Sequence, residues 1–497
     1  MTLTHILALA ALASGYNLLS GRRNLLCHRT WILLAVSLAG IYWLQPATPL
    51  RNFDFWFPTL TIALAAGTWA VVRSRETSAS REDLLAGLLI LGIILGVGAT
   101  RYLGPLCCLT ASRPPQFWVV LLVVGGLAGL LAVLARCAGS RRILPYAFTL
   151  LIVGLFIVLK SEPMGSAAGA WLRRAGGQSA DLATAFDLRW LGFSYLAFRL
   201  LHALRDYQAG RLPACSLAEF TTYALFLPSY TAGPIDRYQH FVAELRGKGS
   251  GPNNPIAGVE EVDQARPASM PQDLAQGAQR LLTGLVKKFV LADSLALIAL
   301  SGETAAQIAS PGWMWVVLYA YALRIYFDFA GYTDIALGLG RLFGIQLPEN
   351  FTNPYFKTNL AQFWNSWHIT LTQWFRAYFF NPLTRALRTT HSSIPTWATV
   401  LLGQLGTMLL IGLWHGSDAN FAAWGLWHGL GLFVQNRWTG WIGLRLGRPV
   451  SHPATKRWLA IGGWFLTFHY VTLGWVWFAL PDVGLSWTVF RRLVGLP

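Results

Sequence analysis

The chain has 497 residues, of which 54% are hydrophobic and only 12% are charged, about half the charged fraction of soluble domains. This composition excludes an ordinary soluble domain and indicates a protein that crosses a membrane several times. The net charge of +17 could suggest nucleic acid, but the arginines are spread over short loops instead of forming one stripe. We therefore expect a lipid bilayer and no nucleic acid as partner.

Apolar runs follow one another along the chain. A helix needs about 20 residues to cross the hydrocarbon core of a bilayer. Runs of suitable length lie at 4–20, 30–46, 55–72, 83–100, 116–135, 143–160, 187–203, 278–300, 312–330, 396–414 and 458–480, and shorter or glycine-interrupted runs lie at 217–232 and 419–435. The pattern predicts an all-α polytopic membrane protein with about 11 to 13 membrane segments.

The loops between the first runs predict the orientation. Basic residues gather in the first, third and fifth loops, which hold Arg22, Arg23 and Arg29, then Arg73, Arg75 and Arg81, then Arg136, Arg141 and Arg142. By the positive-inside rule these loops are cytoplasmic and the N-terminus lies outside. Residues 1–15 have no basic segment before the apolar stretch, so we expect a retained first helix and not a cleaved signal.

Polarity divides the chain into two parts. Residues 1–185 have almost no ionisable group inside an apolar run, so we expect helices that form a wall. Residues 186–480 carry polar and ionisable groups within such runs. Such groups are usually tolerated only at a cavity or in a pair, so the functional site is predicted to lie in this part. The polar stretch 246–273 is predicted to be a flexible loop, and 481–497 a C-terminal tail. The five cysteines form no C-x-x-C pair and no zinc spacing, so no metal site is predicted.

The aromatic stretch NLAQFWNSWHITLTQWFRAYFFNPL covers residues 359–383. As one helix, it would show an apolar stripe beside a polar line of Asn365, His368, Thr372 and Arg376. Two interpretations stay open: an interfacial helix whose polar line faces headgroups, or a helix whose His368 lines the floor of a reaction tunnel. Upstream, Arg324 and Asp328 are four residues apart and are predicted to form an ion pair on one helix face.

The stretch GLWHGSDANFAAWGLWHG, residues 412–429, carries Gly-Leu-Trp-His-Gly twice. On one continuous helix, His415 and His428 would be about 20 Å apart and would not touch. The intervening Ser-Asp-Ala-Asn resembles a helix break or cap, so we expect two consecutive segments. His415 is either a hydrogen-bonded structural residue or a functional one. His428 lies between Gly425 and Gly429, which would leave room for close approach, and this favours a cavity-facing role.

Four motifs in order carry a family resemblance. They are TAGPIDRYQHF (231–241), YFDFAGYTDIALGLGRLFGIQLPENFTNPY (326–355), FWNSWHITLTQWFRAYFFNPL (363–383) and GLWHG…WGLWHG (412–429). Over roughly residues 220–436 the chain resembles the membrane-bound O-acyltransferase family, in particular the bacterial branch with alginate O-acetylase and the D-alanyl transferase of teichoic acid synthesis. The resemblance implies a ring of tilted helices around a central tunnel or funnel, with residues 186–480 as the catalytic core.

The resemblance also implies roles for residues. The family's invariant histidine falls on His428 and its partner position on His368, as the catalytic pair. The supporting set comprises His415, Asn365, Trp364, Trp367, Trp424, Asp236 and Arg237. Donor binding is expected of Arg376, Lys287 and Lys288, for which ordinary positive-inside topology is the alternative. Relatives commonly carry two basic residues where Asn365 and Ser366 stand, and this departure bears on donor recognition.

The expected reaction moves a short acyl group, favoured to be acetyl, from a cytoplasmic thioester to a hydroxyl of an extracytoplasmic polysaccharide or cell-wall polymer, in a bacterial cytoplasmic (inner) membrane. A neutral histidine would act as general base. No bound cofactor is expected; the donor would be acyl-CoA or a phosphopantetheinyl acyl carrier protein, and an acyltransferase partner outside the membrane could finish the transfer. The alternatives are D-alanyl transfer to teichoic acid and a non-catalytic transporter or flippase.

Overall fold

The computed structural model describes residues 2–20, 28–73, 80–104, 107–137, 143–247, 270–390, 393–446 and 453–496. Within these ranges the chain is helical and forms no strand; an isolated bridge joins Phe351 and Trp367. The all-α prediction is thereby confirmed. The chain divides into two compact units, one of Met1–Leu281 with Ile335–Pro348 and the other of Leu282–Asp334 with Glu349–Pro497. This division follows spatial contacts, whereas the predicted division at residue 185 is one of polarity and stays a prediction.

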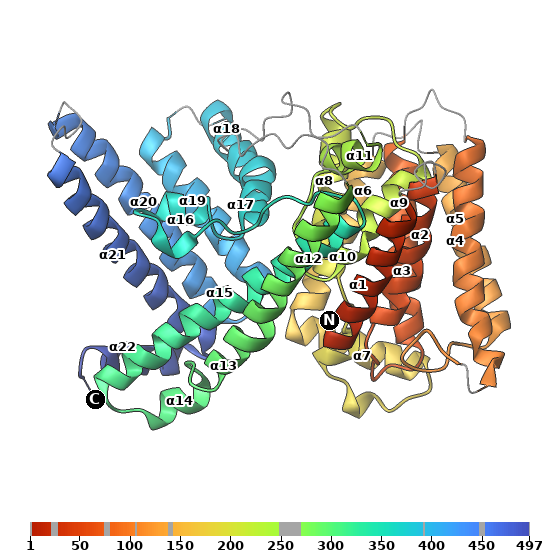
Figure 1. Cartoon of the computed structure of the whole chain (residues 1–497), viewed down its shortest axis with the longest axis horizontal. Coiled ribbons are helices and arrows are strands. Elements are labelled where there is room, and N and C mark those ends of the chain that lie inside the picture. The colour runs from red at the N-terminus through yellow and green to blue at the C-terminus, as the bar shows by residue number, and fades with distance from the viewer. Residues whose placement is uncertain are drawn as a thin grey trace. The chain divides into compact units, whose positions relative to one another are not determined.

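The first unit is built from the N-terminal helices (Figure 1). They are α1 (Leu3–Ser20), α2 (Arg29–Leu44), α3 (Phe53–Val72), α4 (Arg81–Ala99), α5 (Phe117–Cys137), α6 (Leu144–Lys160), α7 (Glu162–Ala175), α8 (Phe193–Gln208), α9 (Leu217–Leu225), α10 (Leu227–Tyr230), α11 (Tyr238–Leu245) and most of α12 (Met270–Leu285). Helix α9 packs against α2, α3 and α4. Ser80 and Asp83 form a capping box that starts α4, and Asp83 also accepts a hydrogen bond from the Leu217 N–H at the start of α9, so one acidic residue fixes two helix ends.

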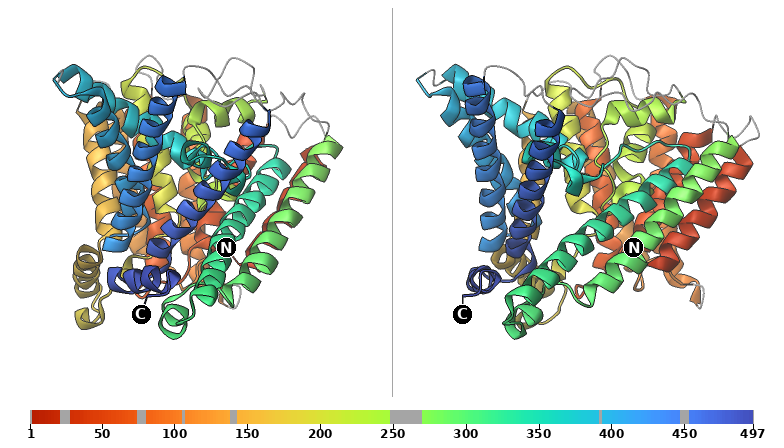
Figure 2. Two further views of the ribbon diagram at one scale, coloured as in Figure 1. Left: turned by 90° about the vertical axis from the view of Figure 1, so that its left-hand side faces the viewer. Right: turned by 60° about the vertical axis from the view of Figure 1, so that its left-hand side comes forward.

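The second unit holds the helices that follow. They are a π-helical turn (Val286–Ala292), α13 (Asp293–Ala296), α14 (Gly302–Gln307), most of α15 (Pro311–Leu342), α16 (Leu360–Trp364), α17 (Ile369–Phe375), a π-helical turn (Arg376–Phe380), α18 (Asn381–Thr390), α19 (Thr396–His415), α20 (Ala419–Leu446), α21 (Pro453–Ala479) and α22 (Val483–Leu493). Helices α19, α20 and α21, blue in Figure 2, are packed in sequence, α20 touching both of the others.

Five helices in the described ranges are long and apolar enough to cross a membrane, within Phe53–Val72, Arg81–Tyr102, Phe117–Leu134, Thr396–His415 and Pro453–Ala479. A sixth span results if α6 and α7, bent by 96° at their junction, are counted as one. These helices make the chain a multi-pass membrane protein. The expected 11 to 13 segments exceed the number that length and hydropathy support. The reason is that α1 and α2 are shorter, α8 and α15 carry ionisable side chains, and the run at 217–232 is broken into α9 and α10.

Several predicted segments have a definite outcome. Most of the polar stretch 246–273 lies outside the described residues, but its last four residues are helical because α12 begins at Met270. Most arginines of the first, third and fifth loops also lie outside them, and the orientation stays a prediction.

The predicted tail contains α22, whose Val489 and Leu493 are buried against Leu318 of α15 and Val476 of α21. Asp482 caps this helix by accepting a hydrogen bond from the Leu485 N–H.

Candidate active site

The doubled pentapeptide forms a helical hairpin. Helix α19 ends at His415 and α20 begins at Ala419, which confirms the break between two consecutive segments. The close approach that Gly425 was predicted to allow is made by α19: a Cβ atom on Gly425 would lie 2.5 Å from the Met408 carbonyl oxygen. Gly429 faces Leu405 of α19 in the same way. These glycines therefore let the backbones of α19 and α20 approach closely.

His428 is enclosed by aromatic rings. Its side chain is 0% exposed, with ring centroids of Trp424 at 4.9 Å, Trp364 at 5.2 Å and Trp475 at 6.4 Å. Neither imidazole nitrogen has a hydrogen-bond partner among the described residues. On the α21 side, a Cβ atom on Gly474 would come within 2.8 Å of Nε2, so the absence of a side chain there makes space for the ring. Unpartnered buried nitrogens are uncommon in folded proteins.

The aromatic stretch 359–383 is not one helix, contrary to prediction. Helix α16 ends at Trp364 and α17 begins at Ile369, with His368 between them in the left-handed region at φ 45°. The break arises because this short segment pairs with a distant one: Trp367 bridges Phe351, and the Thr352 N–H donates to the Ser366 carbonyl oxygen. The predicted polar line is therefore interrupted. At this break His368 lies in the interior, where it is 2% exposed.

Of the two ring nitrogens of His368, one has a hydrogen-bond partner among the described residues and the other has none. Nδ1 lies 3.2 Å from Asn350 Oδ1, and Nε2 has no hydrogen-bond partner in the part of the chain that the structure describes. Phe329 packs edge-on at 4.7 Å and Trp414 lies at 6.1 Å. Burial holds the pKa of His368 well below its usual value, and the charge of a protonated His415 lowers this pKa further. The imidazole is consequently neutral at pH 7 and able to accept a proton.

His415 is the most accessible of the three histidines, since it is half-buried at the end of α19. Its ring contacts Phe478 at 4.8 Å and Trp424 at 5.6 Å. Trp424 therefore touches both His415 and His428, while the neighbouring Trp414 touches His368. The fold thus gathers the three histidines, from the turn before α17, from α19 and from α20, around Trp414 and Trp424.

The other predicted residues of the second unit fall into two groups. Trp364 and Trp424 line His428, and their indole nitrogens have no hydrogen-bond partner among the described residues. Trp367 packs within the aromatic core, with its ring tilted against that of Trp475 at 5.1 Å. Asn365 lies further out and accepts a hydrogen bond from the exposed Arg376 guanidinium at 2.6 Å.

The two predicted lysines are engaged in ion pairs. Lys287 lies 2.7 Å from Asp334 and Lys288 2.5 Å from Asp328. The expected pairing of Arg324 with Asp328 is wrong, because the π-helical turn after α12 brings Lys288 to that carboxylate. Binding of the donor by these lysines stays a prediction.

Asp236 and Arg237 belong to the first unit. Asp236 is 5% exposed; it accepts a hydrogen bond from the Arg237 N–H and lies 2.8 Å from His240 Nδ1. This carboxylate raises the pKa of His240 to about 9. Sequence analysis did not single out His240, although its position four residues after Asp236 on a short helix is a pairing signal.

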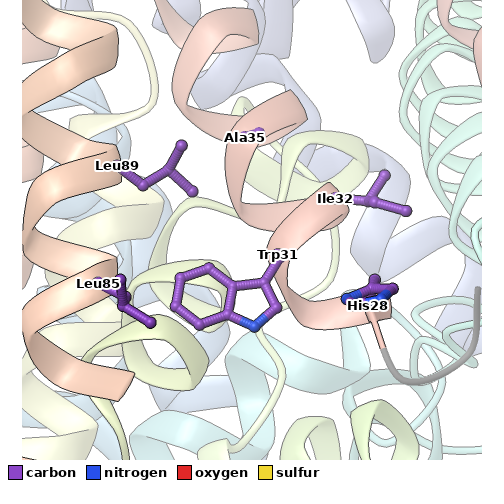
Figure 3. A pocket seen from close by; sticks show the side chains of 6 residues that line it. All are labelled: His28, Trp31, Ile32, Ala35, Leu85 and Leu89. Carbon is purple, nitrogen blue, oxygen red and sulfur yellow. The ribbon is translucent and has the colours of Figure 1, made fainter. Parts of the chain in front are cut away.

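The first unit also holds an apolar hollow of about 550 Å³. Its lining is His28, Trp31, Ile32, Ala35, Leu85 and Leu89, and Figure 3 shows Trp31 of α2 extending toward Leu85 of α4. With His28 as the one titratable side chain in this lining, the hollow lacks the paired polar groups that acyl transfer requires.

The region that carries the three histidines matches a known protein family. The model of the membrane-bound O-acyltransferase family matches residues 146–478, a range that includes all three histidines and the helices that carry them. The chain belongs to the membrane-bound O-acyltransferase family. The predicted resemblance is confirmed, and it extends upstream of the motifs on which it was based.

Three bacterial proteins are similar to this chain. The chain is 30% identical to a probable alginate O-acetylase of Pseudomonas aeruginosa over 61% of this chain and 51% of that protein. It is 30% identical to a teichoic acid D-alanyltransferase of Streptococcus thermophilus over 59% and 68%, and 32% identical to a peptidoglycan O-acetyltransferase of Helicobacter pylori over 56% and 48%. The chain spans about half the length of the alginate O-acetylases that it matches.

Proposed function

We propose that this protein transfers a short acyl group, acetyl in the first instance, from a cytoplasmic thioester to a hydroxyl group of an extracytoplasmic polysaccharide or cell-wall polymer. The membrane would be a bacterial cytoplasmic membrane. Family membership supports the O-acyl transfer, and two of the three relatives above are named as O-acetylating proteins of such polymers. The observation that carries the proposal is the buried His368, whose Nε2 is open and whose neighbour is the accessible His415.

The chemistry needs only a general base and a dry site. The imidazole takes the proton of the acceptor hydroxyl, the oxygen attacks the thioester carbonyl carbon, the C–S bond breaks, and the proton passes to the departing thiolate. General base catalysis of this kind contributes roughly 10²–10⁴ in rate. The tryptophan cluster around the histidines would keep out water that competes with the acceptor.

Burial distinguishes the candidates for the base. A base must come within hydrogen-bond distance of the acceptor hydroxyl; His415 is half-buried, whereas His368 and His428 are both buried, and the charge of His415 acts on His368. We therefore propose that His415 and His368 meet the substrates. His428, the base expected from the family resemblance, is the alternative, for which Trp424 or Trp364 would have to move.

The donor would be acyl-CoA or a phosphopantetheinyl carrier protein, both anionic. Arg376 is exposed and hydrogen-bonded to a neutral amide, so its charge is available to such a donor. Lys287 and Lys288 are neutralised by carboxylates and would contribute less. An extracytoplasmic acyltransferase that completes the transfer fits the same proposal.

D-Alanyl transfer is the second candidate. The observation that favours it is coverage, because the match spans 68% of the Streptococcus thermophilus D-alanyltransferase and 51% of the Pseudomonas aeruginosa protein. The donor separates the two candidates: an acetyl transferase accepts acetyl-CoA or an acetylated carrier, whereas a D-alanyl transferase accepts only an aminoacylated carrier protein.

The test uses the full chain in liposomes with isotopically labelled acyl donor inside and polysaccharide acceptor outside. We expect His368→Ala and His415→Ala each to lower covalent acyl transfer by about 10²–10⁴. His469→Ala is the matched control, because His469 is hydrogen-bonded to Tyr319 and to the Phe465 carbonyl oxygen and lies outside the cluster. Tryptophan emission reports whether each variant is folded.

The outcomes separate the assignments. Loss of transfer in His428→Ala with a normal rate in His415→Ala would return the base to His428. Normal rates in both His368→Ala and His415→Ala would refute a histidine base at this cluster. Passage of label across the membrane without covalent product would indicate a transporter or flippase.

A further inference from the structure

Asn350 is a buried polar residue that sequence analysis did not single out. It lies in the segment between α15 and α16, within the motif LPENFTNPY, and is 0% exposed. Its side chain contacts His368 and Thr370, and its backbone contacts Ile369, 18 to 20 residues further along the chain. The backbone carbonyl oxygen accepts a hydrogen bond from the Ile369 N–H at 3.0 Å. Asn350 therefore lies directly against the residue pair that follows His368.

The orientation of the Asn350 amide follows from its partners. The oxygen and nitrogen of an asparagine amide are hard to tell apart by shape and are assigned from their hydrogen bonds. Here the Thr370 main-chain N–H, which can only donate, lies 3.1 Å from Oδ1, and Thr370 Oγ1 lies 2.9 Å from the same atom. An amide nitrogen at that position would face a donor. The atom beside Thr370 is consequently the oxygen.

The same oxygen determines which ring nitrogen of His368 carries the proton. Nδ1 of His368 lies 3.2 Å from Asn350 Oδ1, and an amide oxygen can only accept. Nδ1 must therefore carry the proton. In a neutral imidazole the lone pair is then on Nε2, which is the nitrogen without a partner in the described residues.

We propose that Asn350 is a positioning residue that holds His368 in the Nδ1–H tautomer and thereby presents Nε2 as the proton acceptor. The tautomer follows from the hydrogen bonds alone. The use of Nε2 as acceptor rests on the proposed acyl transfer. Asparagine suits this role because a neutral oxygen fixes the tautomer without stabilising the imidazolium, as a carboxylate would.

Neighbouring elements add no competing partner. Phe329 of α15 and Phe351 pack against the ring, and their side chains offer no hydrogen-bond acceptor of the oxygen or nitrogen kind. The titratable group whose charge acts on His368 is His415 at the end of α19, and like charges do not compete for the Nδ1 proton. Within the described residues Asn350 is thus the one hydrogen-bond acceptor at the His368 ring.

The first test reads the tautomer directly. The full chain is labelled with ¹⁵N-histidine and placed in lipid nanodiscs, and the His368 signals are assigned by their loss in His368→Gln. The two nitrogens of a neutral ring differ widely in ¹⁵N shift and are told apart by their couplings to the ring protons. We expect a protonated Nδ1 and a bare Nε2, and a mixture of tautomers in Asn350→Ala. Thr370→Val, which removes one donor to the same oxygen, is expected to keep the Nδ1–H form.

A protonated Nε2 in the unaltered protein, or an unchanged tautomer in Asn350→Ala, would overturn the inference. Should Asn350→Ala fail to fold, the spectrum of the unaltered protein still decides, together with Asn350→Asp. That variant places a carboxylate beside Nδ1, and we expect the acid limb of the pH–rate profile to move up by about 1–3 pH units; an unmoved limb in an active variant would also overturn it. The expected tautomer in a protein that transfers no acyl group would refute the proposed function and leave the role of Asn350 standing.

Discussion

The close approach of α19 and α20 makes a quantitative prediction for Gly425→Ala. The added Cβ atom would lie 2.5 Å from the Met408 carbonyl oxygen and 2.9 Å from Leu409 Cα, whereas ordinary contact begins at 3.4 Å. Relief of the closest contact therefore needs a separation of about 0.9 Å between 2.5 and 3.4 Å. Both atoms belong to the backbone of α19, so no side-chain rotation can absorb the shift. Such overpacking costs about 1–3 kcal/mol.

A matched glycine removes the effect of helix propensity from this comparison. Alanine is favoured over glycine by about 1 kcal/mol inside a helix, and this gain applies to both substitutions. At Gly406 of α19 the nearest atom to an added Cβ is a side-chain carbon of Phe379 at 3.6 Å, which is ordinary contact. Gly406→Ala should therefore be neutral or stabilising. The two variants should differ by the overpacking energy, about 1–3 kcal/mol.

The assay is thermal unfolding in detergent micelles, followed by tryptophan emission at one fixed scan rate because membrane proteins often unfold irreversibly. Gly425→Ala should unfold at a lower temperature than Gly406→Ala. Acyl transfer should also fall by about 10²-fold in Gly425→Ala, because a displacement near 1 Å of α19, which ends at His415, disturbs the reacting geometry. Equal unfolding temperatures and equal rates for the two variants would refute the close packing of α19 against α20.

The remaining predictions concern ion pairs. Lys287→Met should lower the free energy of unfolding by about 1.5–3 kcal/mol, since the lysine donates a charged hydrogen bond to the buried Asp334. Lys288→Met should change it by at most about 1 kcal/mol, because the carboxylate of its partner Asp328 is half-exposed. Equal unfolding temperatures for the two variants would contradict this ranking. His240 has a folded pKa of about 9, raised from 6.5 by Asp236. Its contribution to stability is thus complete below pH 6.5 and lost as the pH rises through 9; the unfolding temperature measured across this range should decline, and Asp236→Asn should remove the decline due to His240.

Local sequence was sufficient for the helices and their breaks in much of the chain. The length of the apolar runs predicted helices such as α3, α4, α5 and α19, since this signal depends only on neighbouring residues. The Ser-Asp-Ala-Asn break after His415 was visible for the same reason. The family followed from four motifs in order, because each motif combines residue types at fixed spacing.

The geometry around His368 could not be predicted from local sequence. The segment 359–383 has helical periodicity, but its helix is interrupted where Trp367 pairs with the distant Phe351, and local propensity does not encode such pairing. Asn350 as its partner, Lys288 as the partner of Asp328, and the exposure that favours His415 over His428 are likewise contacts between remote residues. The sequence by itself determined that this is a helical membrane protein of the acyltransferase family. Only the tertiary structure decided which ring nitrogen of His368 has a hydrogen-bond partner, because that depends on which groups the packed backbone brings within about 3 Å of the ring.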